Sequence, residues 1–341
     1  AAALVPVLVR EAGMPFRTVL TIHHLAEQGS FWGLDFGLTN LPERYFSLRG
    51  IEYCGRMNLL KGGVLYADRV TTVSERYRRE ILTPEGGCGL DPVLRQNAHK
   101  LSGILNGADY ARWNPATDAF LPAVFDSTNL NGKGACRNQL LDELQLELPS
   151  ARTIVFGMVA RLVAEKGFGI VVPLLDRLLS DDVRLIILGE GDPAYETALA
   201  VAAKKYPGKF AYRQSYDERV AHLIEAGTDV TLVPSRIEPS GLSAMYSLKY
   251  GALPVACATG GIHEIIEDYD PVAHSGFGFL CYDSSTEAFW DSIKRAREIY
   301  RREPETWAAL VQRAMSQNFA WETAAERYEA IYGDLVLRAA A

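Results

Sequence analysis

The sequence has few cysteines, no long apolar run and no excess of positive charge. Its five cysteines, at positions 54, 88, 136, 257 and 281, form no Cys-x-x-Cys pair. This spacing argues against a disulfide framework or a structural zinc, and for a reducing compartment. No apolar run approaches the roughly 20 residues that cross a bilayer, and the apolar start lacks the basic leader of a signal peptide. The net charge of −7 argues against a nucleic-acid binder. We therefore expect a cytoplasmic protein that binds neither membranes nor nucleic acid.

The composition is that of a globular protein with a sizeable core. Of the 341 residues, 48% are apolar and 23% are charged. This length favours two domains over one. A helix expected over residues 133–146 leads to Pro149, where we place the domain boundary.

The first part of the chain begins with a short helix, Leu4 to Glu11, and a strand over residues 17–22. That strand is a continuous apolar run, which is typical of a strand buried on both faces of a parallel sheet, and it delivers His23 to its carboxyl end. Residues 29–52 show no clean period and predict an irregular excursion. The other expected elements are a helix at 58–67, a strand at 68–73, a helix that Ser74 caps, and a strand at 101–105 that ends at Asn106.

After Pro149 strands and helices alternate regularly, which predicts an α/β fold with a doubly wound parallel sheet. Ser215 with Glu218, and Ser284 with Glu287, fit capping boxes. The expected strands are 153–160, 183–188, 209–213, 229–233, 253–257 and 276–281, and the expected helices are 167–180, 193–205, 216–226, 241–250, 261–267, 286–302, 304–317 and 320–337.

The stretch from Pro234 to Gly251 follows a buried strand and runs into a helix. It places Glu238 and the turn Gly241-Leu242-Ser243 at the carboxyl end of a parallel strand, where open α/β sheets bind ligands. Free amide groups at a helix start suit a phosphate, and a fixed carboxylate beside them suits a sugar. An ordinary βα loop would use the same Pro and Gly for turn chemistry, so both interpretations are open on this stretch alone.

Two cations, Arg161 and Lys166, follow the first strand after Pro149. Such a pair can neutralise a leaving diphosphate, as a metal does elsewhere; a solvated surface pair is the alternative. The turn Thr259-Gly260-Gly261 opens another helix, and its amides suit an anion, although a tight βα turn would look the same.

Three further positions have weaker signals. His23 could bind a sugar hydroxyl, or it could be a structural histidine at a strand end. Tyr216 could stack on a nucleobase, or it could be a packing residue. The triplet Asp268-Tyr-Asp270 spells a metal-binding motif of some sugar transferases, but its polar turn next to Pro271 favours a solvated loop, and we expect no metal site.

Taken together, six ordered blocks resemble the family of bacterial glycogen synthase and plant starch synthase, retaining glucosyltransferases that extend α-1,4-glucan. The blocks span nearly all of the chain. They are residues 21–29 (TIHHLAEQG, like the family's TIHNLAYQG), 61–74 (KGG, AD and TVS in the family's order), 103–115 (GILNGADYARWNP, like GILNGIDxxxWNP), 161–167 (RLVAEKG, like RLxxQKG), 216–222 (YDERVAH, like YxExLAH) and 234–251 (PSRIEPSGLSAMYSLKYG, like PSRxEPCGLxQxYxxxYG).

The resemblance implies two Rossmann-like domains of the GT-B type with the active site in the cleft between them. The first domain would be residues 1–149, on the acceptor side, and the second would be residues 150–318, which bind the nucleotide sugar. A last helix, 319–341, would cross back to the first domain. The implied donor is a nucleoside-diphosphate glucose, usually ADP-glucose, with UDP-glucose open, and no metal or other cofactor is implied. The protein would be cytoplasmic, or plastidial in a photosynthetic eukaryote.

The resemblance also implies roles for single residues. Arg161 and Lys166 would hold the diphosphate, Glu238 would sit by the glucose, and His23 would support the glucosyl group. The remaining donor-binding positions would be Gly241, Leu242, Ser243, Thr259, Gly260, Gly261, Tyr216 and Asn106.

The chain departs from the family in several places. It has no Lys-x-Gly-Gly-Leu loop, which in the family contacts the donor diphosphate, and the match begins partway through the first domain. Ser240 stands where the family has Cys, and Ala244 where it has Gln. We expect the first domain to be incomplete, so that the strand at 17–22 has an open edge. The chain would then be a fragment, be completed by a second chain, or have lost these strands with much of its activity.

Three functions are open on these observations. The first is glucose transfer to the non-reducing end of an α-1,4-glucan such as glycogen or starch. The alternative is a non-catalytic or weakly active glucan-binding homologue, consistent with the absent donor loop. A related glycosyltransferase with another sugar or acceptor is a third, weaker possibility.

Overall fold

The structure is a computed structural model that describes residues 1–340. Its contacts divide the chain into two compact units, one formed by residues 1–106 with the C-terminal helix from Trp321, and one by Gly107–Ala320. The boundary that we expected at Pro149 differs from this division. Residues 107–149 group with the second unit because helix α5 (Asn131–Glu143) packs along helix α9 (Glu218–Gly227) of that unit.

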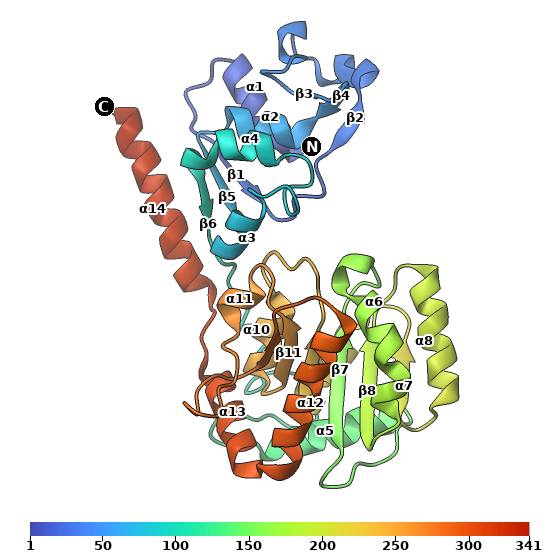
Figure 1. Cartoon of the computed structure of the whole chain (residues 1–341). Helices are drawn as coiled ribbons and strands as arrows, with labels where there is room; N and C mark the ends of the chain where they lie inside the picture. The colour runs from blue at the N-terminus through green and yellow to red at the C-terminus, as the bar shows by residue number, and fades with distance from the viewer. Residues whose placement is uncertain (341) are drawn as a thin grey trace. The chain divides into compact units, whose positions relative to one another are not determined.

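The first unit contains a three-stranded parallel sheet in the order β1-β5-β6 (Figure 1). Residues Val19–Ile22 of β1 pair in register with Arg69–Thr72 of β5, so β1 is an edge strand within the described residues. The Ser74 side chain accepts a hydrogen bond from the Tyr77 amide, 3.0 Å away, and this confirms the predicted helix cap. The remaining elements are β6 (Leu101–Gly103), α1 (Val5–Glu11), α2 (Leu59–Tyr66), α3 (Glu75–Glu80) and α4 (Asp91–Gln96).

The excursion over residues 29–52 is more ordered than its sequence indicates. It contributes to a small antiparallel sheet of β2 (Ser30–Trp32), β4 (Arg56–Asn58) and β3 (Glu52–Tyr53). Its apolar residues form a core of their own with helix α1 and neighbouring segments. The buried members are Val7, Phe36, Leu41, Tyr45, Ile51, Met57 and Leu59.

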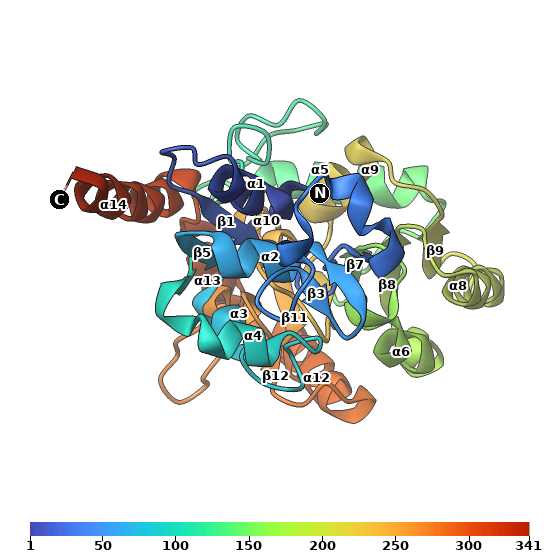
Figure 2. The ribbon, with the colours of Figure 1, turned by 90° about the horizontal axis from the view of Figure 1, so that it is seen from above.

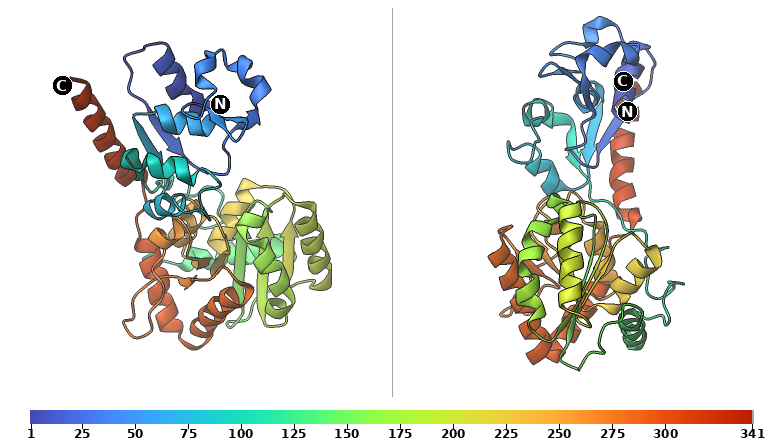
Figure 3. Two further views of the ribbon diagram at one scale, coloured as in Figure 1. Left: turned by 45° about the horizontal axis from the view of Figure 1, so that its top comes forward. Right: turned by 90° about the vertical axis from the view of Figure 1, so that its right-hand side faces the viewer.

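Helix α14 (Trp321–Ala340) belongs to the first unit although it ends the chain. Its Asp334 forms an ion pair with Arg69 of β5, and its Leu335 is buried. The left-hand view of Figure 3 shows this helix and the strands of the unit from a second direction.

The second unit is a six-stranded sheet in the order β12-β11-β10-β7-β8-β9, and all of its strand pairs are parallel. This confirms the predicted doubly wound α/β fold. Helices α5 and α9 lie on one side of the sheet and α6 and α12 on the other (Figure 2). The strands are β7 (Ile154–Val159), β8 (Val183–Leu188), β9 (Phe210–Arg213), β10 (Val230–Val233), β11 (Leu253–Cys257) and β12 (Phe279–Cys281), and the main remaining helices are α8 (Pro193–Lys205), α10 (Leu242–Lys249), α12 (Thr286–Arg302) and α13 (Pro304–Ser316).

Four local predictions in this unit differ from the structure. The helix expected at 167–180 is divided into α6 (Phe168–Val171), a 3₁₀ turn and α7 (Leu175–Leu179), because Pro173 lacks the amide that a continuous helix needs. The caps of α9 and α12 are Asp217 and Ser285, not Ser215 and Ser284. Helix α11 covers only Ile262–Ile265.

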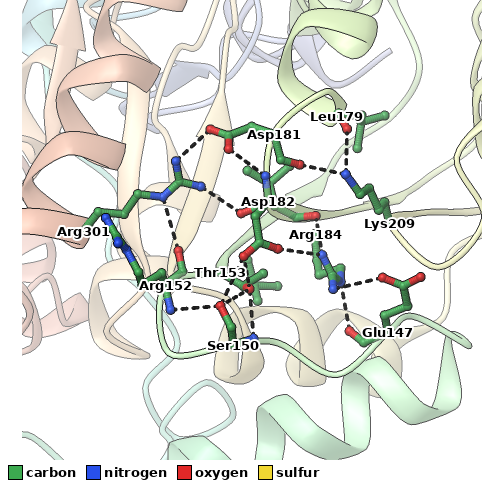
Figure 4. Close-up of polar contacts among 12 residues, drawn as sticks. Glu147, Ser150, Arg152, Thr153, Leu179, Asp181, Asp182, Arg184, Lys209 and Arg301 are labelled. Carbon is green, nitrogen blue, oxygen red and sulfur yellow. Dashed lines mark hydrogen bonds and ion pairs between the residues drawn. The ribbon is translucent and has the colours of Figure 1, made fainter.

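A polar cluster fixes the amino-terminal ends of β7 and β8 (Figure 4). Asp182 accepts hydrogen bonds from Thr153 Oγ1 at 2.7 Å and Ser150 Oγ at 3.1 Å, and it pairs with the buried Arg184 at 3.3 Å. Burial acts to raise the pKa of Asp182, but these hydrogen bonds and the Arg184 charge lower it overall. The cluster holds the amino-terminal ends of these strands. The loops at the carboxyl ends of the strands are described next. The right-hand view of Figure 3 shows the unit from the side of α8.

Candidate functional site

The strand order of the second unit reverses between β7 and β10. From β7 the chain moves outward to β8 and β9, and it then returns to β10 and moves in the other direction to β11 and β12. The connections that leave β7 and β10 therefore run in opposite directions along the sheet, and doubly wound folds bind ligands at such a switch point. Most of the residues expected in the site lie in these two loops and in the one after β11.

The loop after β7 supplies the two expected cations. Arg161 is exposed, and its guanidinium lies 3.6 Å from the carboxylate of Glu165. Lys166 ends a 3₁₀ turn, and Gly167 after it has φ 80°, a left-handed conformation that favours glycine. A side chain at Gly167 would also collide with the backbone of Pro234, so the glycine lets the β7 and β10 loops approach each other.

The loop after β10 supplies Glu238, which is 8% exposed. Its Oε2 atom lies 2.7 Å from Lys166 Nζ and accepts a hydrogen bond from Ser235 Oγ at 2.9 Å. Lys166 and Glu238, which are 72 residues apart in the sequence, therefore form an ion pair at the switch point. Ser235 was not among the expected site residues, although it lies within the same sequence block.

Backbone hydrogen bonds join the three loops. The Arg236 amide donates to the Glu165 carbonyl at 2.8 Å, and the Gly261 amide donates to the Glu238 carbonyl at 2.9 Å. A Cβ at Gly260 would collide with that same carbonyl of Glu238, so a residue larger than glycine does not fit there. Arg161, Lys166, Glu238 and the Thr259–Gly261 turn consequently lie on one connected set of loops.

The start of α10 offers donors to an anion. Gly241 has φ 90° and precedes the helix, whose first residues are Leu242 and Ser243. The Ser240 hydroxyl is buried and has no hydrogen-bond partner among the described residues. Thr259 Oγ1 donates to the Arg236 carbonyl at 3.2 Å, so this hydroxyl is used within the loops. Amides at a helix start together with Lys166 suit a phosphate group.

The other expected residues are not brought to these loops by any contact that we observe in the described chain. Tyr216 lies between β9 and α9 and is 59% exposed, as a surface for stacking requires. Asn106 ends the first unit, and its Oδ1 atom is buried without a hydrogen-bond partner among the described residues. His23 is exposed at the end of β1 in the first unit. Their roles remain predictions.

The structure contains a partly buried cluster of aromatic side chains that was not predicted from the sequence. The ring of Trp113 stacks on His222 of α9 at 3.7 Å and on Tyr246 of α10 at 4.5 Å between ring centroids. The carboxylate of Asp118 lies 2.7 Å from His222 Nδ1 and accepts the Tyr250 hydroxyl at 2.5 Å. The cluster ties the loop after residue 107 to two site helices. Its members come from three separate segments of the sequence, and only the fold reveals their contact.

Lys133 holds the carboxyl ends of the same two helices. Its Nζ atom donates to the carbonyls of Ala226 at 3.0 Å and Tyr250 at 2.8 Å, at the ends of α9 and α10. Burial lowers the pKa of Lys133 to about 8. Burial likewise raises the pKa of Glu225, on α9, to about 8, so this carboxyl is largely protonated at neutral pH.

Within residues 1–340, no group of three or more His, Cys, Asp or Glu side chains is arranged to hold a metal ion. Asp268 of the expected loop pairs with Arg295 at 3.0 Å. Over the same residues, none of the helices has the length and apolar character of a membrane span.

The sequence matches two known families. Residues 1–96 match the starch synthase catalytic domain, and residues 145–314 match glycosyl transferases group 1. The chain is 41% identical to a glycogen synthase of Koribacter versatilis over 97% of its own length and 69% of that protein. It is 44% identical to a glycogen synthase of Opitutus terrae, over 98% and 70% respectively. Across such relatives it spans between 62% and 70% of their length.

Solved structures agree with this match. The catalytic domain of starch synthase IV from Arabidopsis thaliana, bound to ADP and acarbose, superposes with a TM-score of 0.93 at 30% identity, covering 97% of this chain and 70% of that one. A sucrose-phosphate synthase from Thermosynechococcus elongatus gives a TM-score of 0.62 at 18% identity, which shows a shared fold.

The switch-point site and these superpositions define a glycosyltransferase of the GT-B class whose first domain is partial. Within that class, the chain belongs to the glycogen synthase and starch synthase family.

Proposed function

We propose that this chain transfers glucose, with retention of configuration, from ADP-glucose to the non-reducing end of an α-1,4-glucan. The observation that supports this most directly is the Lys166–Glu238 ion pair at the switch point, in a chain of the glycogen and starch synthase family. The starch synthase structure bound to ADP and acarbose supports a nucleotide sugar as donor and a glucan as acceptor.

In this proposal the donor diphosphate lies against Arg161, Lys166 and the start of α10. The charge of Lys166 is already balanced by the carboxylate of Glu238. A bound diphosphate brings further negative charge, which the second cation, Arg161, can balance. The amides after Gly241 and in the Thr259–Gly261 turn, with the Ser243 hydroxyl, donate to the phosphate oxygens.

Glu238 would sit beside the glucose during the same-face displacement. Its carboxylate is held by Lys166 and Ser235, which fixes the direction in which its other oxygen points. Tyr216 would stack on the adenine, and Asn106 and His23 would contact the donor. The two cations take the role of a metal, and we propose that no metal is needed.

A donor assay tests this proposal. The chain is incubated with glycogen and either ADP-glucose or UDP-glucose, each labelled with ¹⁴C in the sugar, and label in the precipitated glucan is counted with and without EDTA. We expect incorporation that is faster from ADP-glucose and unaffected by EDTA. Glycogen binding without incorporation from either donor would instead support the non-catalytic alternative.

A further inference from the structure

Two cysteines face each other at the carboxyl ends of two neighbouring strands in the six-stranded sheet. Cys257 ends β11 and Cys281 ends β12, and the two residues are direct partners in the parallel register. The thiol of Cys281 donates to Cys257 Sγ across 3.1 Å. They are 1% and 4% exposed, respectively. This arrangement is unrelated to the roles given above to the loop residues.

We propose that Cys257 and Cys281 form an oxidation site for hydroperoxides, in which a disulfide between them disturbs the adjacent Thr259–Gly261 turn. The thiolate of Cys257 attacks the peroxide oxygen, breaks the O–O bond and becomes a sulfenic acid while the other oxygen leaves as water or an alcohol. The Cys281 sulfur then displaces hydroxide, which leaves as water. Two thiols and one hydrogen peroxide give one disulfide and two waters.

The environment favours Cys257 as the attacking thiol. The hydrogen bond from Cys281 lowers the pKa of Cys257, against the opposing effect of burial, and the charge of Arg236 contributes to the lowering. The same contact, together with burial, raises the pKa of Cys281. A thiolate is the reactive form of cysteine, and sensor cysteines are commonly placed beside a second, resolving cysteine.

The backbone geometry permits the bond. Neighbouring strands lie about 4.8 Å apart, and disulfides join Cα atoms separated by about 4.4–6.8 Å. Side chains of paired residues in a parallel sheet point to the same face, as the sulfur contact of 3.1 Å shows here. Closing to a disulfide of about 2.05 Å requires an approach of roughly 1 Å.

The approach of the two sulfur atoms would displace the Thr259–Gly261 turn. The Ala258 amide, next to Cys257, donates to the Cys281 carbonyl at 2.9 Å, so β11 and β12 move together there. Gly260, three residues after Cys257, lies against the Glu238 carbonyl with no room for a side chain. A shift of Cys257 therefore reaches both the Thr259–Gly261 turn and the backbone of Glu238. This consequence rests on the proposed function, whereas disulfide formation does not.

The test uses the full chain with Cys54 and Cys88, the two exposed cysteines, changed to serine. It is treated with hydrogen peroxide, alkylated under denaturing conditions and analysed by intact mass and peptide mapping. Binding of ADP is measured by calorimetry before oxidation, after oxidation and after dithiothreitol. Cys281→Ala and Cys257→Ala, each in the same background, are the matched controls, and two variants are used in case one fails to fold.

We expect a mass loss of two hydrogens, a cross-linked peptide joining residues 257 and 281, and ADP binding that weakens about tenfold, the equivalent of one lost hydrogen bond, and recovers with dithiothreitol. The control variants should form no such cross-link and keep their ADP affinity in peroxide. The proposal is overturned if both thiols stay reduced while Cys136 is oxidised, or if the disulfide forms and ADP affinity is unchanged. A chain that never binds ADP but forms the disulfide would contradict the proposed function and leave the oxidation site standing.

Discussion

Lys166 connects two loops that the sequence separates by many residues, and it does so through a single charge. Its Nζ atom bonds Glu238 at 2.7 Å, so a diphosphate can use this cation without rearranging the backbone. Lys166→Met should weaken ADP binding about 10- to 100-fold, the effect of losing about 1.4–2.7 kcal/mol from a charged hydrogen bond. Calorimetry measures the affinity.

The matched control is Lys205→Met, which removes the exposed ion pair between Lys205 of α8 and Asp176 of α7. This variant should bind ADP as the unchanged chain does, because surface ion pairs contribute little. Equal ADP affinities for the two variants would contradict the role of Lys166.

Glu225 makes a second residue-level prediction, on stability. Its pKa is raised from 4.5 to about 8 by burial, so the folded chain keeps the proton over a pH range in which the unfolded chain has lost it. Between these values the free energy of unfolding should fall as pH rises, by about 1.4 kcal/mol per pH unit from this group. The contribution is fully favourable below pH 4.5.

Urea denaturation of the chain and of Glu225→Gln at several pH values from 5 to 8 measures that slope. The variant has no proton to lose, so its advantage over the unchanged chain should grow with pH across the window. The control is Glu305→Gln, at an exposed position of α13. A difference between chain and variant that stays constant with pH would show that Glu225 is ionised when folded.

At the level of elements, helices α9 and α10 are held by two residues outside them. Lys133 bonds their carboxyl ends, and Asp118 bonds His222 and Tyr250. Asp118→Ala should lower the free energy of unfolding by about 2–5 kcal/mol, because two buried polar groups lose their acceptor. Chemical denaturation followed by circular dichroism measures this loss.

Asp126→Ala provides the comparison, since Asp126 is exposed on the same segment and accepts hydrogen bonds only locally, from Thr128 and Asn129, among the contacts that we observe. Asp126→Ala should lower the free energy of unfolding by much less than Asp118→Ala does. Similar losses for both variants would mean that the buried cluster adds nothing beyond local turn geometry.

Elements with strong periodicity were predictable from sequence, and those set by tertiary contacts were not. The strands of the second sheet are apolar runs between turn residues, and the structure places them within a few residues of their predicted bounds. By contrast, the small sheet with β2 forms because Phe36 and its neighbours pack into a core. No alternation of apolar and polar residues predicts its strands. The short 3₁₀ turn at Pro173 shows that one residue can end a helix that periodicity would continue.

The same contrast holds for the site. Glu238 and Lys166 were expected from their places after strands and from the family blocks, but their mutual ion pair depends on the order of strands in the sheet. Ser235 and the Trp113–His222 contact could not be predicted, because each depends on which loops and helices become neighbours.

On the scale of the whole chain, the position of β1 at the edge of its sheet carries a prediction. Within the described residues β1 pairs only with β5, and its Val19 is half-buried. Unpaired backbone groups on an apolar edge strand favour pairing with another chain. The chain should associate as its concentration rises, and sedimentation velocity measures the average mass.

Val19→Lys should reduce that association, because a charged side chain on an edge strand disfavours further pairing. Val201→Lys, at a position of α8 that is 61% exposed, is the control and should leave association unchanged. A chain that sediments as a monomer at every concentration would contradict the open edge.

Glu238→Gln tests the central claim most directly, with initial rates of glucose transfer from labelled ADP-glucose to glycogen measured beside ADP affinity. The amide keeps the size of the side chain but removes the charge held by Lys166 and Ser235. We expect transfer to fall by about 10² to 10³-fold while ADP binds as tightly or more tightly, because Lys166 is no longer shared with a carboxylate. Transfer at the rate of the unchanged chain, with glutamine at position 238, would contradict the account.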